Sequence, residues 1–505
     1  MNDAVLIVGA GPVGMTLAIA LSRRGVAVRI VDKAQARTDK SKALVLWPRT
    51  LEMLDIEGCA AAFVSAGMPA RGVNIQEAGG RSLLHVPFSM ARSTWKFALM
   101  IPQSETERLL EEELARLQVT VERSTELVSF VERETGLLAS IRLADGRMES
   151  FSASWIAGCD GAHSTVRHAI GAAFEGETSP SDFLLADVEV QGDVARDELT
   201  ICWAAEGIAA FFPIDGLRMR VIADCGPSGQ LASAVPTLEA VQAIVDQRAA
   251  PGLRLANPFW LNSFRINERK VRDYRRGRVF LAGDAAHVHS PAGGQGMNTG
   301  MQDAFNLAWK LAMVWHGRAS PGLLDSYSTE RSAVGDQVLR NAGNLTRVAM
   351  LRNPLLQEIR RLATRSLGRL PALRQHMVDQ LSEVDLEYAD SPLTRAGTGA
   401  PSRPAPGQRA VDIALVPGAH GLATLNEILR AGKFAVLSVG VPAAALPPDL
   451  QEFATAAQAD ANADYPGGHV WLIRPDGYVA TAVHARHAQE LVTILGTIMS
   501  PPAVA

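Results

Sequence analysis

The chain has 505 residues, a formal net charge of −4 and four cysteines. This length predicts two to four domains, and the even mixture of both charges argues against nucleic-acid or membrane-surface binding. No two cysteines have C-x-x-C spacing, so we expect no metal centre and no dithiol redox chemistry. The cysteines are Cys59, Cys159, Cys202 and Cys225.

The N-terminus lacks a basic region, and its first apolar run leads directly into a glycine motif, so we expect no signal peptide. No apolar run of about 18 residues escapes interruption by charge, proline or glycine. These two features predict a soluble chain in the reducing cytoplasm.

The first predicted unit is a strand, a glycine turn and a helix. An apolar run over residues 4–8 precedes Gly9-Ala10-Gly11-Pro12-Val13-Gly14, and a helix over residues 15–24 follows. A second strand over residues 26–31 ends at Asp32. This G-x-G-x-x-G arrangement is typical of dinucleotide binding, although the motif alone does not separate NAD from FAD.

Each residue of this motif has an expected role. Gly9 makes the turn, Gly11 admits the pyrophosphate to the helix N-terminus, and Gly14 allows close packing of helix and strand. Asp32 would bind the ribose hydroxyls. Further residues expected at the cofactor are Pro12, Val13 and Lys33.

Between residues 40 and 117 the pattern predicts two helices and the first strands of a second sheet. Pro48 suits the first turn of a helix that follows Trp47. Residues 72–100 alternate loosely, as strands do. A helix from Ser104 to Leu117 would begin with a capping box formed by Ser104 and Glu107.

Two further strand ends carry acidic residues. The strand that begins at Trp155 ends in Cys159-Asp160-Gly161, and Ser164 is a good N-cap for the next helix. The run Val279 to Ala282 ends in Gly283-Asp284. Pro291 and a glycine-rich loop follow, and then a segment with helical spacing that continues to Trp315.

Short strand-like runs between about residues 181 and 265 predict an antiparallel sheet over the cofactor. The runs are residues 183–190, 199–203, 208–212 and 218–223. Trp203, Phe211, Phe212 and Arg220 are candidates for an aromatic substrate pocket, and each is equally compatible with a core or surface position. Arg220 would pair with a phenolate or carboxylate.

The three glycine and aspartate signatures, in this order, resemble the FAD-dependent aromatic hydroxylases typified by para-hydroxybenzoate hydroxylase and phenol hydroxylase. The resemblance implies that Asp284 binds the flavin ribityl chain and that Asp160 lies near the pyrophosphate. It places Lys42 and Gln103 at the FAD and the backbone of Leu127 at the adenine. The residues that it places around the isoalloxazine are Gly283, Pro291, Gly294, Gly296, Met297 and Asn298.

The fold implied is mixed α/β, with a Rossmann-like FAD-binding domain, an antiparallel substrate sheet and a thioredoxin-like C-terminal domain. The expected FAD-binding residues are 1–75, 101–180 and 266–345, and the substrate sheet comprises 76–100 and 181–265. Residues 346–400 form a helical connection to the C-terminal domain at 401–505, which has no cysteine. Because all three signatures lie upstream, a chain cut after about residue 400 is expected to keep its flavin.

The function implied is monooxygenation of a phenolic or polycyclic aromatic compound. NAD(P)H would reduce non-covalently bound FAD, O₂ would add to give the C4a-hydroperoxide, and this species would hydroxylate the ring. Pro291, Arg220 and Trp47 are the candidates for positioning the reaction, and a homodimer is considered. Alternatives are a Baeyer–Villiger or epoxidising oxygenase and a non-catalytic FAD-binding protein. A halogenase is disfavoured because no two tryptophans have W-x-W spacing.

Overall fold

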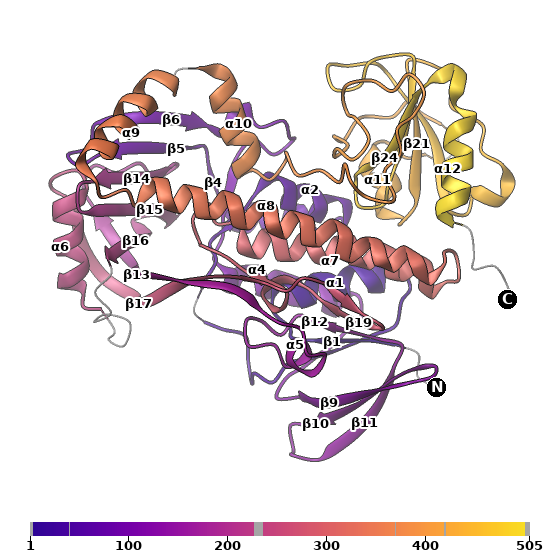
Figure 1. The fold of residues 1–505 in the computed structure, drawn as a ribbon, viewed down its shortest axis with the longest axis horizontal. Helices are drawn as coiled ribbons and strands as arrows, with labels where there is room; N and C mark the ends of the chain where they lie inside the picture. Colours follow the sequence, from indigo (N-terminus) through magenta and orange to yellow (C-terminus); the bar gives the residue numbers. More distant parts are fainter. Residues whose placement is uncertain (1–3, 40, 227–235, 369, 419–420, 500–505) are drawn as a thin grey trace.

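The computed structural model describes residues 4–39, 41–226, 236–368, 370–418 and 421–499. Figure 1 shows a nucleotide-binding part below, a broad sheet to the left and the C-terminal part at the upper right, with the long helices α7 and α8 running between them. The helices in the described part of the chain are α1 Pro12–Arg23, α2 Pro48–Ile56, α3 Ala60–Ala66, α4 Gln103–Arg116, α5 Thr165–Ala169, α6 Leu238–Arg248, α7 Gly296–Trp315, α8 Asp325–Ala349, α9 Pro354–Leu367, α10 Pro371–Leu381, α11 Leu425–Arg430 and α12 Gln489–Met499.

A six-stranded sheet forms the centre of the nucleotide-binding part. Its order is β18 (Arg275–Arg276), β19 (Val279–Leu281), β12 (Trp155–Gly158), β1 (Val5–Val8), β2 (Val28–Val31) and β8 (Val121–Glu122). Strand β1 is parallel to both neighbours and wholly buried, as the continuous apolar sequence requires when both faces of a sheet are covered.

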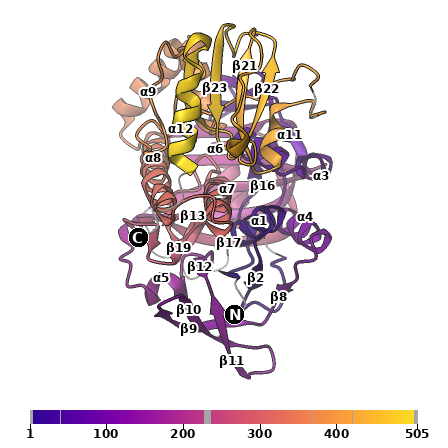
Figure 2. The same cartoon turned by 90° about the vertical axis from the view of Figure 1, so that its right-hand side faces the viewer.

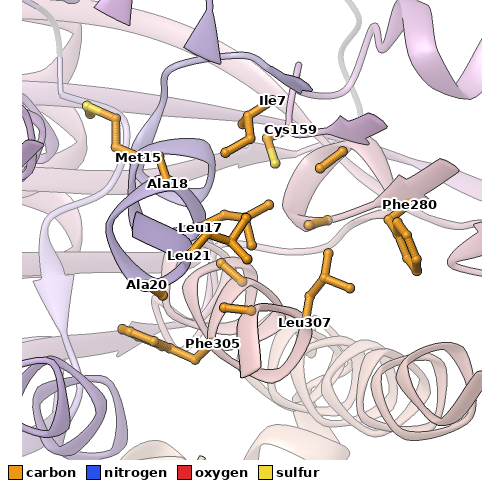
Figure 3. Close-up of a cluster of buried hydrophobic side chains, with 14 of the residues drawn as sticks. Ile7, Met15, Leu17, Ala18, Ala20, Leu21, Cys159, Phe280, Phe305 and Leu307 are labelled. Carbon is orange, nitrogen blue, oxygen red and sulfur yellow. The ribbon is translucent and has the colours of Figure 1, made fainter. Parts of the chain in front are cut away.

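Helices α1 and α7 cover one face of this sheet. Figure 3 shows Leu17 and Leu21 of α1 in the same apolar cluster as Phe305 and Leu307 of α7 and Ile7 of β1. A small antiparallel sheet belongs to the same core and lies at the far side from these helices in Figures 1 and 2. Its strands are β9 Glu126–Arg133, β10 Gly136–Arg142 and β11 Met148–Ala153.

The second large sheet has eight strands, and all of its neighbouring pairs are antiparallel except β14 and β5. Its order is β20 (His287–Val288), β17 (Arg254–Lys270), β13 (Glu175–Gln191), β16 (Arg218–Gly226), β15 (Gly207–Asp215), β14 (Leu199–Ala204), β5 (Gly72–Glu77) and β6 (Ser82–Pro87). All four strand-like runs between 181 and 265 lie in it. Its edge strand β20 follows directly on the Gly-Asp turn, which brings the two large sheets together at that turn.

The C-terminal part contains a four-stranded sheet flanked by α11 and α12. Its order is β22 (Ala454–Ala459), β21 (Phe434–Val439), β23 (His469–Ile473) and β24 (Val479–His484). Strands β21 and β22 are parallel, whereas β21–β23 and β23–β24 are antiparallel. A second three-stranded sheet comprises β3 (Val45–Leu46), β7 (Ala98–Met100) and β4 (Met68–Ala70).

Two local expectations differ from the structure. Helix α4 begins at Gln103 with Pro102 as its N-cap, so the capping box of Ser104 and Glu107 is wrong. Glu107 instead accepts a hydrogen bond from the Gln103 amide at 2.8 Å. The eight-stranded sheet also includes residues outside 76–100 and 181–265, because β5 starts at Gly72, β13 starts at Glu175, β17 runs to Lys270 and β20 spans His287–Val288.

A buried ionic cluster joins the C-terminal part to α7 and α8. Arg474 pairs with both oxygens of Glu330 at 2.6 and 2.9 Å and with Asp476 at 2.6 Å, and Lys310 donates to Glu330 at 2.7 Å. All four side chains are at most 4 % exposed. None of the described helices is long and apolar enough to cross a membrane.

Candidate flavin and substrate site

A cavity of about 370 Å³ lies where the Gly-Asp turn, the start of α1 and the eight-stranded sheet meet. Many of the residues predicted at the cofactor or the substrate line it. They are Gly11, Pro12, Val13, Lys42, Gln103, Arg220, Asp284, Pro291, Gly294, Gly296 and Met297, together with Phe212. His289 and Ser290 of the loop 287–291, an alternative to Arg220 as a substrate-positioning segment, also line it. Lining residues that were not predicted there include Ala43, Leu44, Val45, Cys159 and Ile222.

A second cavity of about 230 Å³ adjoins the first, because Gly11, Cys159 and Gly161 line both. It contains the residues expected at the adenosine end, namely Gly9, Asp32, Lys33, Leu127 and Asp160. The two cavities together make an elongated site that runs from the end of β2 past the start of α1 to the eight-stranded sheet.

The glycine turn has the geometry that its sequence predicts. Gly9 has φ +102°, and a Cβ there would lie 2.4 Å from the Cys159 carbonyl oxygen. A Cβ on Gly14 would lie 1.9 Å from the Gly9 carbonyl oxygen, whereas a Cβ on Gly11 would meet nothing within 4 Å. Gly9 and Gly14 are therefore fixed by close packing, and the space at Gly11 is open to a ligand.

The acidic residues at the strand ends keep the loops around the small cavity in place. Asp32 accepts hydrogen bonds from the backbone N–H groups of Ala10 and Ala34 at 2.7 and 2.8 Å. Asp160 accepts from the Ser164 hydroxyl, and Ser164 caps α5 as expected, accepting from the Arg167 N–H at 2.9 Å. Each carboxylate retains lone pairs for a ligand hydroxyl.

Asp284 is the acidic group of the large cavity. Asp284 is exposed to the cavity that it lines, and its carboxylate has no hydrogen-bond partner among the described residues. The protein packed around it raises the pKa of Asp284 above its usual value, and His287 and Lys42 oppose that rise. A carboxylate on a cavity wall that lacks a protein partner is free to accept hydrogen bonds from a ligand.

Asn298 and Trp47 hold the glycine-rich loop from behind the cavity. The Asn298 amide donates to the carbonyls of Val45 and Gly294, and its oxygen accepts from the Trp47 backbone N–H at 2.9 Å. The Trp47 indole donates to the Gly293 carbonyl at 2.9 Å. Neither side chain is among the cavity-lining residues, so both support the loop rather than touch its contents. Gly283 and Gly14 also lie behind the wall, where a Cβ on Gly283 would meet Val13 at 2.8 Å.

Arg220 is buried in the cavity wall and already paired. Its guanidinium makes two hydrogen bonds to Asp187, at 2.7 and 2.9 Å, and donates to the carbonyls of Ser41 and Lys42. It is 2 % exposed, so it is not a solvent-exposed charge of the sheet face. Arg220 connects the sheet to the 41–45 loop, which also lines the cavity, and most of its N–H groups are occupied before any substrate binds.

Behind Asp284 lies a buried network that sequence reasoning missed. Asp303 of α7 accepts hydrogen bonds from the Gly283 N–H and from His287, at 2.9 and 2.8 Å, and pairs with Arg331 of α8 at 2.6 Å. These contacts fix the turn that aims Asp284 into the cavity. Asp303 and Arg331 each lie among apolar residues of a helix. Because charged side chains are almost never buried unless they are paired, these positions could have indicated an ion pair.

Of the three remaining aromatic candidates, Phe211 and Trp203 lie away from the cavity and Phe212 lines it. Phe211 is 0 % exposed and belongs to the core under α6, and Trp203 lies under the guanidinium of Arg360 at 4.3 Å. Phe212 faces the cavity opposite Arg220 in the strand register, and Ile222 is two residues farther along the same face. Because alternate residues of a strand point to the same face, the prediction for Arg220 could have been extended to Ile222.

These features fit FAD. The open face at Gly11, the start of α1 and the unpartnered Asp284 provide positions for a pyrophosphate and for ribityl hydroxyls, and the start of α7 offers free N–H groups to an anionic ring. No group of three His, Cys, Asp or Glu side chains in the described residues could hold a metal ion. A larger surface hollow beside Arg275 and Asp336 is open, and those two side chains pair with Asp325 and Lys270.

Comparisons with known proteins agree with this geometry. A family model for an FAD-binding domain matches residues 2–342, and a model for the C-terminal region of aromatic-ring hydroxylases matches residues 403–502. The curated 6-methylpretetramide 4-monooxygenase of Streptomyces rimosus is 38% identical over 402 residues, which cover 78% of this chain and 71% of that protein.

Two solved structures match along almost the whole chain. The anhydrotetracycline hydroxylase OxyS from Streptomyces rimosus is 27% identical, with a TM-score of 0.79 and complete coverage of both chains. The Diels-Alderase PyrE3 of pyrroindomycin biosynthesis is 28% identical, with a TM-score of 0.80, 99% coverage of this chain and 100% of that one.

Proposed function

The chain belongs to the FAD-dependent aromatic-ring hydroxylases, and from that premise we propose that it hydroxylates a phenolic or polycyclic aromatic compound with NAD(P)H and O₂. It is a flavoprotein monooxygenase, as its relatives are. The observation that carries the proposal is the cavity between the two large sheets, with the unpartnered Asp284 on one wall and Phe212, Ile222 and Arg220 on the other.

Bound FAD would supply the redox chemistry and the activated oxygen. The protein would bind the ribityl hydroxyls through Asp284 and place the negative end of the reduced ring at the start of α7, where free N–H groups stabilise an anion. Pro291 and the glycine-rich loop would let the ring approach the backbone closely. Phe212 and Ile222 would exclude water, which protects the activated oxygen from release as peroxide.

The names of the relatives include both larger and single-ring aromatic compounds. Two of them name 6-methylpretetramide and anhydrotetracycline, and a third, at 38% identity, names pentachlorophenol. In this chain the apolar side chains Phe212 and Ile222 suit the face of an aromatic ring, the cation of Arg220 is held by Asp187, and Lys42 is assigned to the cofactor. We therefore propose a neutral phenolic ring system rather than a carboxylate.

The C-terminal part has the strand order and directions of a thioredoxin-like sheet, which supports that assignment. It contains no cysteine, so its proposed role is structural. A second candidate function is non-oxygenase catalysis, because PyrE3 has the same fold and is a Diels-Alderase. In that case FAD would be retained without oxygen chemistry. A Baeyer–Villiger outcome is the other alternative on this fold.

The test is NADPH and NADH oxidation with O₂ uptake, measured for the purified flavoprotein across a panel of phenols, naphthols and hydroxyanthracenes. The proposal predicts that at least one compound accelerates cofactor oxidation and gains one hydroxyl group. No acceleration and no product with any compound would favour the non-oxygenase alternative. An ester or lactone formed from an aryl ketone added to the panel would favour the Baeyer–Villiger alternative.

A further inference from the structure

We propose that the outer face of helix α9 pairs with the same face of a second copy of this chain, with the two helices antiparallel. The α9 face consists of Leu355, Leu356, Ile359 and Leu362, which are between 44 and 69 % exposed. Figure 1 shows α9 at the outer edge of the molecule, beside β14, β5 and β6. Single exposed apolar side chains are common on protein surfaces, whereas a group of neighbouring ones marks an interaction site.

Helix α9 is inverted with respect to the usual surface helix, because its charged side chains face the protein. Arg360 lies over the ring of Trp203 at 4.3 Å, and Arg365 makes two hydrogen bonds to Glu77 of β5 at 2.9 and 3.0 Å. A surface helix normally buries its apolar stripe and exposes its charges. The α9 face therefore leaves apolar area in water, and a partner would remove that area from water.

A second copy fits the α9 face better than an anionic lipid surface or a nucleic acid does. Such anionic partners are attracted by free cations, and the cations of α9 are engaged by the protein itself. Arg360 donates to two carbonyl groups of α8, and Arg361 pairs with Glu358 and Glu77. The outward face is thus apolar and suits another apolar face. In a two-fold dimer both partners present the same surface.

The spacing of the apolar residues defines how two copies would pair. Leu355, Ile359 and Leu362 recur at intervals of four and three residues, as positions d, a and d of a heptad do. The exposed Ser366 takes the next a position. Two antiparallel helices in this register place Ile359 against Leu362 of the second copy, and Leu355 against Ser366 of the second copy.

The same register gives charge complementarity beside the apolar seam. Glu358 and Arg365 both occupy g positions, which lie opposite each other in antiparallel helices, so two ion pairs would form across the two-fold axis. Arg365 gives Glu77 only its Nη2 group, and its other N–H groups have no hydrogen-bond partner in the described part of the chain. Parallel helices would place the g positions opposite the e positions, which are Leu356 and Ala363 and carry no charge.

The small size of this surface indicates a reversible dimer. Helix α9 has 14 residues and is therefore about 21 Å long. The exposed Val348 and Leu370, which precede and follow the helix, add to its apolar area. A permanent dimer buries about 800 Å² or more on each partner, so we expect a dissociation constant on the order of 10 µM.

The test is sedimentation velocity of the purified holoenzyme at concentrations between about 1 and 100 µM. Wild type should change from monomer to dimer across this range, without larger species. Ile359→Glu should raise the dissociation constant at least about tenfold, because each dimer would bury two carboxylates against leucine side chains. Met148→Glu places the same charge at an exposed apolar position of β11 and should dimerise like wild type. FAD content should be equal in all three proteins.

Cross-linking tests the antiparallel register. A mixture of the Ile359→Cys and Leu362→Cys variants, oxidised in air, should form more disulfide-linked dimer than either variant alone. Equal cross-linking, a wild type that stays monomeric throughout the range, or an unchanged dissociation constant in Ile359→Glu would overturn the inference. Binding of monomeric wild type to phosphatidylglycerol vesicles, lost in Ile359→Glu, would assign the α9 face to a lipid surface and would also overturn it.

Discussion

We expect flavin binding to depend on Asp284. Asp284→Ala should weaken FAD binding by about 1–3 kcal/mol, because ribityl hydroxyls would lose a charged acceptor in the cavity. This corresponds to an increase of roughly 5- to 150-fold in the dissociation constant. Fluorescence titration of the apoprotein with FAD measures it. The exposed Asp193→Ala serves as the control, and equal constants in the two variants would make Asp284 a turn residue only.

Arg220 controls how firmly the 41–45 loop is held against the cavity. Arg220→Ala should release the carbonyls of Ser41 and Lys42 and leave Asp187 without its partner, so the substrate ring is held less firmly. We expect NAD(P)H oxidation to continue while product falls and hydrogen peroxide accumulates, since a misplacement of about 1 Å can cost about 10²-fold in rate. Arg218→Ala, on the same strand but stacked on Phe259, is the control. Wild-type coupling in Arg220→Ala would remove Arg220 from this role.

At the scale of elements, helix α7 carries a pH-dependent contact. Burial raises the pKa of Glu383 to about 8, against an ordinary value of 4.5, and this carboxyl group bonds to Thr299 and Gln302 of α7. The folded state therefore prefers the protonated form, and this stabilisation is full below about pH 4.5 and is lost as the pH rises through about 8.

Glu383→Gln should remove that dependence. Between pH 5 and pH 8.5 the free energy of unfolding of wild type should fall by more than about 1 kcal/mol relative to that of the variant, because one pKa unit is worth about 1.4 kcal/mol. Urea unfolding at both pH values measures the difference, with the exposed Glu387→Gln as the control. Parallel pH profiles in wild type and Glu383→Gln would refute this account of the helix contact.

The sequence predicted best those features that depend on residues close together in the chain. Gly14 and Ser164 play the parts expected of them, because the close approach of the helix to its own turn and an N-cap depend on residues nearby in the chain. The partners of Arg220 were not predictable in this way. They come from β13 and from the loop at Ser41 and Lys42, and the polarity of a single residue says nothing about which donor or acceptor the fold brings to it.

At the scale of the whole molecule, the C-terminal part is not an independent appendage. The sequence predicted that a chain cut after about residue 400 keeps its flavin, because all three signatures lie upstream. The structure argues against it, since the cut would remove Arg474 and Asp476 and leave Glu330 and Lys310 buried without those partners, on the helices that flank the flavin site. We therefore expect the cut chain to be unstable and poor in flavin.

Arg474→Ala tests this coupling without truncation. Removing one partner from a buried ion pair typically costs about 3–5 kcal/mol, because the opposite charge stays buried. We expect the free energy of unfolding of the holoenzyme, measured in urea, to fall by about that amount, and the flavin to be released in the same transition. The exposed Arg486→Ala should unfold like wild type. Equal stability of both variants would show that the C-terminal part is only loosely attached.

We propose that this cavity directs one oxygen atom from O₂ onto an aromatic ring. Mass spectrometry of the product formed under ¹⁸O₂, with NAD(P)H and the most active phenol, measures that transfer. We expect one ¹⁸O atom in a new ring hydroxyl group for each NAD(P)H consumed in the coupled reaction. A product without ¹⁸O, or cofactor oxidation that yields only labelled peroxide with every phenol tried, would contradict it.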